Sequence, residues 1–205
     1  MHIELTEMLR CPEAHREDTM VLSTGEMIGR MVRSGLVGCS VCRKEFFIKD
    51  GIVDFTGQGT GEGRRVRSGV TSPPSPVPPP ADLQALLELS GPGGFVVLLG
   101  DATRFAAGLA ELMAGIHFVG VNAPANTEEL PVLSLLRCSG AIPLRQSFAR
   151  GVVIGADLAT SPWLVEAHRI LLRGRRLVTL HEKPELPIGL EQLATAKGLW
   201  VGEKK

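Results

Sequence analysis

The cysteines of this chain are unevenly placed, with three of four in its first quarter. Cys39 and Cys42 form a Cys-x-x-Cys turn that aims two thiolates at one point, which is half of a tetrahedral zinc site. The second half should be a similar turn roughly 15–30 residues away. Cys11 lies at such a distance, but Ala14 occupies the expected second cysteine position and His15 is the nearest replacement. The spacing predicts a structural zinc ion held by three thiolates and one imidazole.

A metal-free module remains an alternative, in which the same cysteines are small buried apolar residues. Cys138 lies far along the chain in an apolar stretch, and we expect it to be a core thiol. The chain starts without a signal peptide pattern, no apolar run is long enough to span a bilayer, and we expect a cytoplasmic protein with reduced thiols. Lys plus Arg and Asp plus Glu both number 22, so no net charge attracts nucleic acid or membrane.

Catalytic side chains are not visible in the sequence. Asp101 and Asp157 each follow an apolar run, where a general base or a substrate contact could lie, but helix caps and loop residues occupy the same positions. His117, His168 and His181 have no Cys, Ser or Asp partner in a recognisable motif. We therefore assign no catalytic residue.

Composition divides the chain into two domains. Residues 57–82 are rich first in Gly and Arg and then in proline, with six prolines in residues 71–80, which predicts an extended linker. Residues 1–56 are too few for a self-sufficient core and need a metal or disulfide. Residues 83–205 alternate between helical and strand-like segments, which predicts a mostly parallel sheet with helices on both faces.

The elements expected in the second domain follow from apolar runs and their flanking residues. A helix should begin at a capping Asp82, and further helices are expected over 102–114, 162–172 and 190–196. Strands are expected over 95–99, 116–121, 151–155, 176–180 and 199–201. The last of these leaves little room for a closing hairpin.

Three segments of the N-terminal part form a recognisable pattern: Leu9-Arg10-Cys11-Pro12, Gly38-Cys39-Ser40-Val41-Cys42 and Phe47-Ile48-Lys49-Asp50-Gly51-Ile52-Val53. With this pattern, residues 3–55 resemble the bacterial Trm112-like zinc ribbon family. Family members are small modules that bind and stabilise methyltransferases, so the resemblance implies a small β-rich zinc ribbon with a protein partner. Ala14 departs from the Cys-Pro-x-Cys of the family and leaves the fourth ligand open.

The C-terminal part contains four segments in a characteristic order: Val96-Val97-Leu98-Leu99-Gly100-Asp101-Ala102-Thr103-Arg104, Phe118-Val119-Gly120-Val121-Asn122, Ala141-Ile142-Pro143-Leu144 and Glu166–Val178. With these segments, residues 94–202 resemble class I S-adenosylmethionine-dependent methyltransferases. The resemblance implies a Rossmann-like, doubly wound α/β fold. In an active member the cofactor would contact Gly100, Asp101, Thr103 and Asn122.

Departures from that family concern the cofactor loop. The first loop glycine is kept as Gly100, but Ala102 and Arg104 replace the next two, and their side chains should crowd the cofactor. Asn122 stands where an acidic residue would accept hydrogen bonds from the ribose, and Arg175 replaces a glycine before a later strand. These changes make S-adenosylmethionine an unexpected cofactor.

The sequence favours a non-catalytic pseudo-methyltransferase with a structural zinc ribbon, acting as a scaffolding, stabilising or assembly subunit for a protein partner such as a methyltransferase or larger assembly. Exposed aromatic rings at Phe46, Phe47 and Phe55 could contact that partner, or they could form the ribbon core. The first alternative is an active methyltransferase with an atypical loop. The second is a ribbon that binds RNA through Arg64, Arg65 and Arg67, but three arginines supply little affinity.

Overall fold

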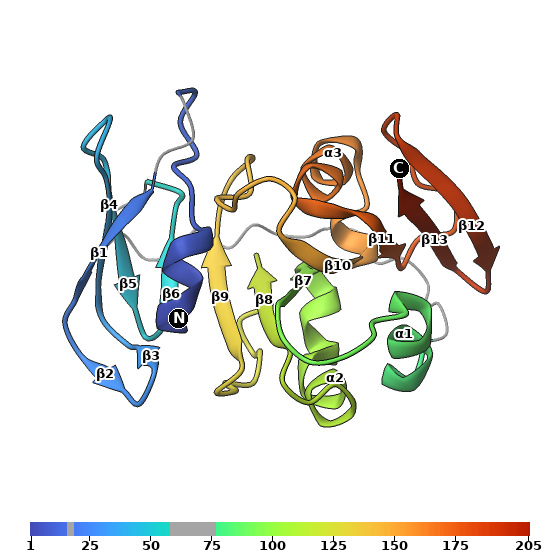
Figure 1. The fold of residues 1–205 in the computed structure, drawn as a ribbon, viewed down its shortest axis with the longest axis horizontal. Coiled ribbons are helices and arrows are strands. Elements are labelled where there is room, and N and C mark those ends of the chain that lie inside the picture. Colours follow the sequence, from blue (N-terminus) through green and yellow to red (C-terminus); the bar gives the residue numbers. More distant parts are fainter. Residues whose placement is uncertain (16–18, 58–76) are drawn as a thin grey trace.

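The structure is a computed structural model that describes residues 1–15, 19–57 and 77–205. Its main feature is an eleven-stranded sheet with the order β1-β4-β5-β6-β9-β8-β7-β10-β11-β13-β12, seen across the whole width of Figure 1. A separate two-stranded sheet pairs β2 with β3. The strands are β1 (Met20–Thr24), β2 (Met27–Ile28), β3 (Met31–Val32), β4 (Gly35–Cys39), β5 (Glu45–Lys49), β6 (Ile52–Asp54), β7 (Phe95–Leu99), β8 (His117–Val121), β9 (Leu133–Arg137), β10 (Ala149–Ile154), β11 (Leu171–Thr179), β12 (Leu190–Ala196) and β13 (Leu199–Lys204).

Strands β9, β8, β7, β10 and β11 run parallel to one another, and the strand order reverses between β7 and β10. Strand β13 joins β11 in the antiparallel direction and forms a hairpin with β12. Short apolar runs such as that of β7 can be buried on both faces only when both faces of the sheet are covered. The Rossmann-like, doubly wound α/β class expected from the sequence is confirmed.

Helices cover both faces of the parallel strands (Figure 1). Helices α1 (Pro80–Leu87) and α2 (Ala106–Leu112) pack on one face, where Leu83, Leu87 and Leu109 are fully buried. Helix α3 (Ser161–Ile170) packs on the opposite face. Successive side chains of a strand point to opposite faces of the sheet. Val96 and Val97 of β7 therefore lie in different apolar clusters, one on each face.

Several sequence-based expectations for this domain were wrong. Residues 190–196 form strand β12 and not a helix, and the chain does contain a closing hairpin. The spacing of Leu190 and Leu193 is helical, but β12 is an edge strand with its side chains largely exposed, so it carries no alternating apolar pattern. Strand β9 was missed because its apolar run is short. Helix α1 begins at Pro80, with Pro79 at the N-cap, and Asp82 lies in its first turn.

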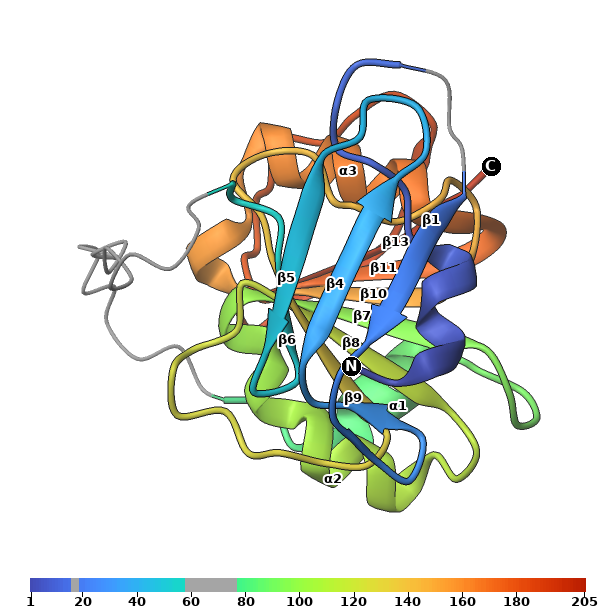
Figure 2. The same cartoon turned by 90° about the vertical axis from the view of Figure 1, so that its left-hand side faces the viewer.

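The N-terminal part contributes four strands to the same sheet, in the order β1-β4-β5-β6 and all antiparallel. Strand β6 then pairs in parallel with β9, matching Ile52 with Leu135 and Val53 with Leu136. These four strands are called the ribbon below, and the elements from α1 onwards are called the α/β part. The ribbon continues the sheet of the α/β part and stands in front of it in Figure 2. Backbone hydrogen bonds join the two parts of the chain.

The first residues of the chain pack on the α/β part. A short 3-10 helix, η1 (Ile3–Met8), carries Leu5 and is followed by Leu9, and both side chains are fully buried in the cluster that also holds α3. Arg145 donates its backbone N–H to Met8 O (2.9 Å), and Arg10 donates its own to Pro143 O (3.1 Å). This segment covers a face of the sheet where the β9–β10 connection has no helix.

An ion-pair network supports the same contact. Arg169 donates from Nε and Nη2 to the two carboxylate oxygens of Glu166 at 2.9 and 2.8 Å, and Ile142 N–H donates to Glu166 Oε2 at 2.7 Å. Arg10 lies 3.7 Å from the same carboxylate. Burial opposes ionisation of Glu166, but its hydrogen bonds from Arg169 and its cationic neighbours hold its pKa below the usual value. The N-terminal segment, the β9–β10 connection and α3 thus share one carboxylate.

Most of the expected linker, including Arg64, Arg65 and Arg67, lies outside the described residues. Among the helices of the described ranges, none combines the length and apolarity needed to cross a membrane.

Because the ribbon and the α/β part share a sheet and a core, we expect them to unfold together. Leu9→Ala should lower the free energy of unfolding by about 2–5 kcal/mol through lost burial and a residual cavity. Urea denaturation followed by the fluorescence of Trp163 and Trp200, the two tryptophans and both in the α/β part, measures this change. Val21→Ala is the control, since Val21 on β1 is 60% exposed and its loss should change stability by less than about 0.5 kcal/mol. A tryptophan transition unmoved by Leu9→Ala would contradict shared folding.

Candidate metal centre and cofactor crevice

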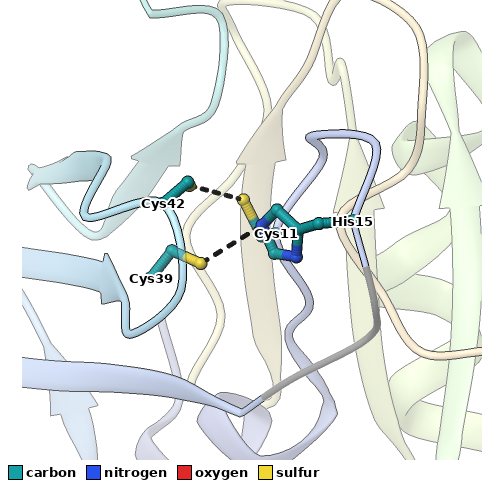
Figure 3. A group of neighbouring side chains, drawn as sticks. All are labelled: Cys11, His15, Cys39 and Cys42. Atoms are coloured by element: carbon teal, nitrogen blue, oxygen red, sulfur yellow. Dashed lines mark hydrogen bonds between the residues drawn. The ribbon is translucent and has the colours of Figure 1, made fainter.

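Cys11, His15, Cys39 and Cys42 lie together, and one ligand atom from each falls within 4.8 Å of the others. The sulfurs of Cys11 and Cys42 are 3.6 Å apart, and His15 Nε2 is 3.4 Å from the sulfur of Cys39 (Figure 3). In a tetrahedral zinc site with bonds of about 2.3 Å to sulfur and 2.0 Å to nitrogen, these separations would be about 3.7 and 3.5 Å. The four residues therefore fit a tetrahedral ion, and they could hold a metal.

Local backbone structure positions the two cysteines of the second turn. Cys39 ends β4, and its N–H donates to Lys44 O while Arg43 N–H donates to Cys39 O, both at 2.9 Å. Arg43 adopts φ +59°, a left-handed conformation that closes the turn. The resulting knuckle directs Cys39 and Cys42 to the same side, towards the loop that follows η1. A sequence-local turn thus supplies one half of the site.

Tertiary packing supplies the other half. Cys11 follows Leu9, whose burial against the α/β part fixes where the loop with His15 begins. Burial raises the pKa of the Cys11 thiol to about 12, whereas a hydrogen bond from the backbone N–H of Lys44 lowers the pKa of Cys42. A protonated, buried thiol is a poor ligand, so metal binding here must release a proton and should weaken in acid.

The three ribbon phenylalanines divide into two kinds. Phe46 and Phe55 are buried, with ring centroids 4.7 Å apart, and belong to the core. Phe47 is 52% exposed on the opposite face of β5. Strand alternation accounts for the difference between the neighbouring residues 46 and 47.

The cofactor crevice of a fold of this class should lie at the carboxyl ends of the parallel strands, where the strand order reverses. That point is between β7 and β10, where two hydrogen bonds join the strand ends. Gly155 N–H donates to Leu99 O at 2.9 Å, and Asp101 N–H donates to Asp157 Oδ1 at 3.1 Å. The 3-10 helix η2 (Gly100–Phe105) begins directly after β7, with no intervening loop.

Asp157 comes closest to the first loop glycine. Gly100 has φ +58°, and a Cβ built there would lie 2.3 Å from Asp157 Oδ2. A Cβ at Gly155 would lie 2.4 Å from Asp157 Oδ1. Asp157 is exposed as a residue, yet its carboxylate rests against this turn, and desolvation raises its pKa above the usual value. The space next to Gly100 therefore holds an acidic side chain.

The side chain that lies against Gly100 is not one of the two expected to crowd the loop. Ala102 is fully buried, and the guanidinium carbon of Arg104 lies 4.9 Å from the ring centroid of the neighbouring Phe105. Thr103 is buried, and its hydroxyl lies 3.4 Å from Leu98 O. Neither Ala102 nor Arg104 is the group that contacts Gly100. Sequence reasoning considered Asp157 as a possible base and did not expect it to pack on the loop, because the two lie 57 positions apart.

Asn122 follows β8 with φ +53°, and both its Nδ2 and its Oδ1 form hydrogen bonds within the chain. Its Nδ2 donates to Cys138 O, and Cys138 N–H donates to its Oδ1, both at 2.9 Å. These two bonds continue the ladder between β8 and β9 beyond the strand ends. The side chain expected to contact a ribose is therefore committed to Cys138.

Other candidate residues do not converge on one site. His117 begins β8, at the amino end of the strands, while His181 follows β11 and His168 lies within α3. Cys138 is buried, which raises its pKa to about 12 as expected for a core thiol. It borders a hollow of about 250 Å³ between the metal cluster and the end of β9, lined also by Lys44, Phe55 and Ala141. Lys44 pairs there with Glu13 at 2.8 Å.

No protein-family model and no curated protein matches the chain. Among solved structures, a chain from the complex of the Haloferax volcanii Trm112 methyltransferase activator with a methyltransferase is 16% identical, with 61% of this chain and 89% of that chain covered and a TM-score of 0.46. A methyltransferase from Aquifex aeolicus, dependent on S-adenosylmethionine (SAM), is 13% identical, with 61% and 88% covered and a TM-score of 0.45. A geranyl diphosphate methyltransferase in complex with SAM is 19% identical, with a TM-score of 0.42, and the match spans 49% of this chain and 46% of that one. These similarities concern the fold.

The geometry of the cysteine cluster predicts that Cys39→Ser removes one tightly bound metal ion per chain relative to the unaltered protein, because one of four converging ligands is lost. Elemental analysis after dialysis measures the ion. Cys138→Ser is the matched control, since Cys138 is buried but lies outside the cluster, and it should retain the full metal content. His15→Cys should also retain the ion, because four thiolates are an equally good zinc set, whereas His15→Ala should not. Equal metal content in Cys39→Ser and Cys138→Ser would contradict the site.

Proposed function

We propose that this chain is a non-catalytic pseudo-methyltransferase with a structural zinc ribbon of the Trm112-like type, acting as a scaffolding or assembly subunit for a protein partner in the cytoplasm. The observation that carries the proposal is the state of the cofactor crevice. Asp157 fills the space beside Gly100 and takes the amide N–H of Asp101, while Asn122 is bonded at both ends of its amide to Cys138. A cofactor would have to displace Asp157 and share the Asn122 amide with Cys138.

The charge of Asp157 adds an energetic argument. In this class of fold the amides after the first strand receive the anionic end of a ligand. Here a carboxylate of the protein already accepts one of them, at 3.1 Å, and Asp101 lies alongside. The carboxylate end of a ligand entering this position would have to compete with Asp157 for the Asp101 N–H. The residues that would have held the cofactor serve instead to join neighbouring strand ends.

Zinc has a structural role in this proposal. Four protein ligands complete a tetrahedral shell, so no position is left for a water or a substrate. An ion held by Cys11, His15, Cys39 and Cys42 would fix the loop after η1 to the β4–β5 turn. The ribbon in turn supplies β6, which pairs with β9. The ion would thus stabilise the extended sheet.

The outer face of the ribbon is the surface that supports a protein partner. Val21 is 60% exposed and Phe47 is 52% exposed. The strand register places Leu36 directly opposite Phe47, and Val21 opposite Gly38, on this one face. Gly38 adds no side chain between them. Aromatic and aliphatic side chains gathered on an exposed sheet face are typical of contact surfaces.

Cofactor binding tests the first part of the proposal. Isothermal titration of the unaltered chain with SAM should give no saturable heat up to about 1 mM ligand. Asp157→Ala should bind no more than weakly, because the Asn122 amide remains committed to Cys138. Saturable binding at micromolar concentration by the unaltered chain would contradict the proposal and favour an active methyltransferase that uses Gly100, Asp101, Thr103 and Asn122.

Partner capture tests the second part. Chemical cross-linking in the native host, followed by mass spectrometry, should identify a protein linked to the ribbon. Phe47→Ser should reduce that capture at least about fivefold, as expected for loss of an aromatic anchor. Ile188→Ser is the matched control, because Ile188 is 99% exposed in the β11–β12 connection, away from the ribbon. Equal capture by the two variants would show that the outer face is not the contact surface.

A further inference from the structure

A second cluster of metal-binding side chains joins the N-terminal segment to the α/β part. His2 and Glu4 come from the start of the chain, and His117 is the first residue of β8. One ligand atom from each of the three lies within 4.8 Å of the others. The cluster shares no residue with the cysteine cluster. It lies at the amino ends of the parallel strands, opposite the edge that carries Gly100 and Asn122.

Two nitrogens in this cluster are buried without a hydrogen bond. The Nδ1 atoms of His2 and His117 are both inaccessible to solvent and have no hydrogen-bond partner. His2 is only 5% exposed as a residue. Buried polar atoms are nearly always paired, so two unpaired ring nitrogens in one place require an explanation. An imidazole nitrogen can donate, accept or bind a metal ion, and one bound ion would satisfy both atoms at once.

The distances suit a small ion. His2 Nδ1 lies 3.7 Å from Glu4 Oε2, too far for a hydrogen bond, and the rings of His2 and His117 have centroids 4.5 Å apart. Around a tetrahedral ion with bonds of about 2.0–2.2 Å, neighbouring ligand atoms lie about 3.3–3.6 Å apart. A small inward movement of these side chains would complete such a set.

The surroundings leave the carboxylate available. Arg30 forms an ion pair with Glu4 through Oε1, so Oε2 still faces His2. The Glu4 side chain is 50% exposed, and water can reach that side of the cluster as a further ligand. An ion pair between a protonated His2 and Glu4 is the simpler reading, but it would leave Nδ1 of His117 unpaired. It would also place a cation against the second imidazole.

We propose that His2, Glu4 and His117 bind a first-row divalent transition-metal ion, such as zinc, that fastens the N-terminal segment to the start of β8. Two imidazoles and one carboxylate are a ligand set that such ions prefer. The site would act as a structural tie between the ribbon and the α/β part, at the opposite edge of the sheet from the cofactor crevice.

Cobalt(II) is the probe for this site, used on the full chain after one equivalent of zinc has filled the cysteine cluster. Zinc should hold that cluster against cobalt, since the affinity order favours zinc. We expect one cobalt ion per chain, with visible d–d absorption and no thiolate-to-cobalt charge-transfer band. His117→Phe should abolish it while keeping a ring to pack on Phe95, whose centroid lies 5.8 Å away. His181→Phe, at a histidine outside the cluster, should bind cobalt as the unaltered chain does.

A second pair of variants tests the site independently, in case His117→Phe does not fold. Glu4→Gln keeps the volume of the side chain and should weaken cobalt binding at least about tenfold. Arg30→Met breaks the same Glu4–Arg30 ion pair without removing a ligand, and it should leave the affinity unchanged or higher. Absence of cobalt binding, a thiolate charge-transfer band, or equal cobalt affinity in Glu4→Gln and Arg30→Met would each overturn the proposal.

Discussion

The parallel pairing of β6 with β9 is the constraint on which the rest of this molecule depends. Strand β9 would otherwise be the edge of the α/β sheet, with a row of unpaired backbone groups facing solvent. The ribbon covers that edge by hydrogen bonding and so becomes an extension of the sheet. Because Val53 and Leu136 are paired across the junction and both buried, a slip of β6 by one residue would turn Val53 away from the face that buries it. Backbone geometry and core burial therefore specify the same junction.

That junction also explains the role of the first ten residues. The connection from β9 to β10 supplies no helix to cover its face of the sheet, and η1 with Leu9 packs there instead. Their position in turn decides where Cys11 begins the loop that meets Cys39 and Cys42. The position of the candidate metal site therefore depends on how the first residues pack against the α/β part. A ribbon of this size gains from both a metal and a large neighbouring core, since its own apolar burial is small.

At the carboxyl edge of the sheet, hydrogen bonds within the chain join neighbouring strand ends. Asn122 extends the β8–β9 ladder, and Asp157 with Gly155 holds the end of β10 to the end of β7. In an open α/β fold these same positions diverge and leave a crevice at the switch point. Here the polar groups that could have bound a ligand are satisfied within the chain.

The sequence by itself determined the local features. Short apolar runs specify buried strands such as β7 and β8, a Cys-x-x-Cys turn specifies half of a metal site, and Cys11 with His15 could be chosen from spacing alone. These features depend on neighbours in the chain, which the sequence displays. The helical spacing of leucines in β12 was misleading because an exposed edge strand has no face to alternate. The short run of β9 carried too few residues to stand out.

Only the tertiary structure decided which side chains distant in the sequence lie in contact. Phe46 and Phe47 have the same side chain, yet one is core and one is surface, because the sheet face they occupy depends on the packing of distant strands. The placement of Asp157 against Gly100, of Asn122 against Cys138 and of His2 against His117 joins residues that lie 16 to 115 positions apart. No local pattern encodes such contacts, since they arise from strand order and register. The residue types therefore indicated which side chains could bind a metal ion, and the fold determined which side chains lie together.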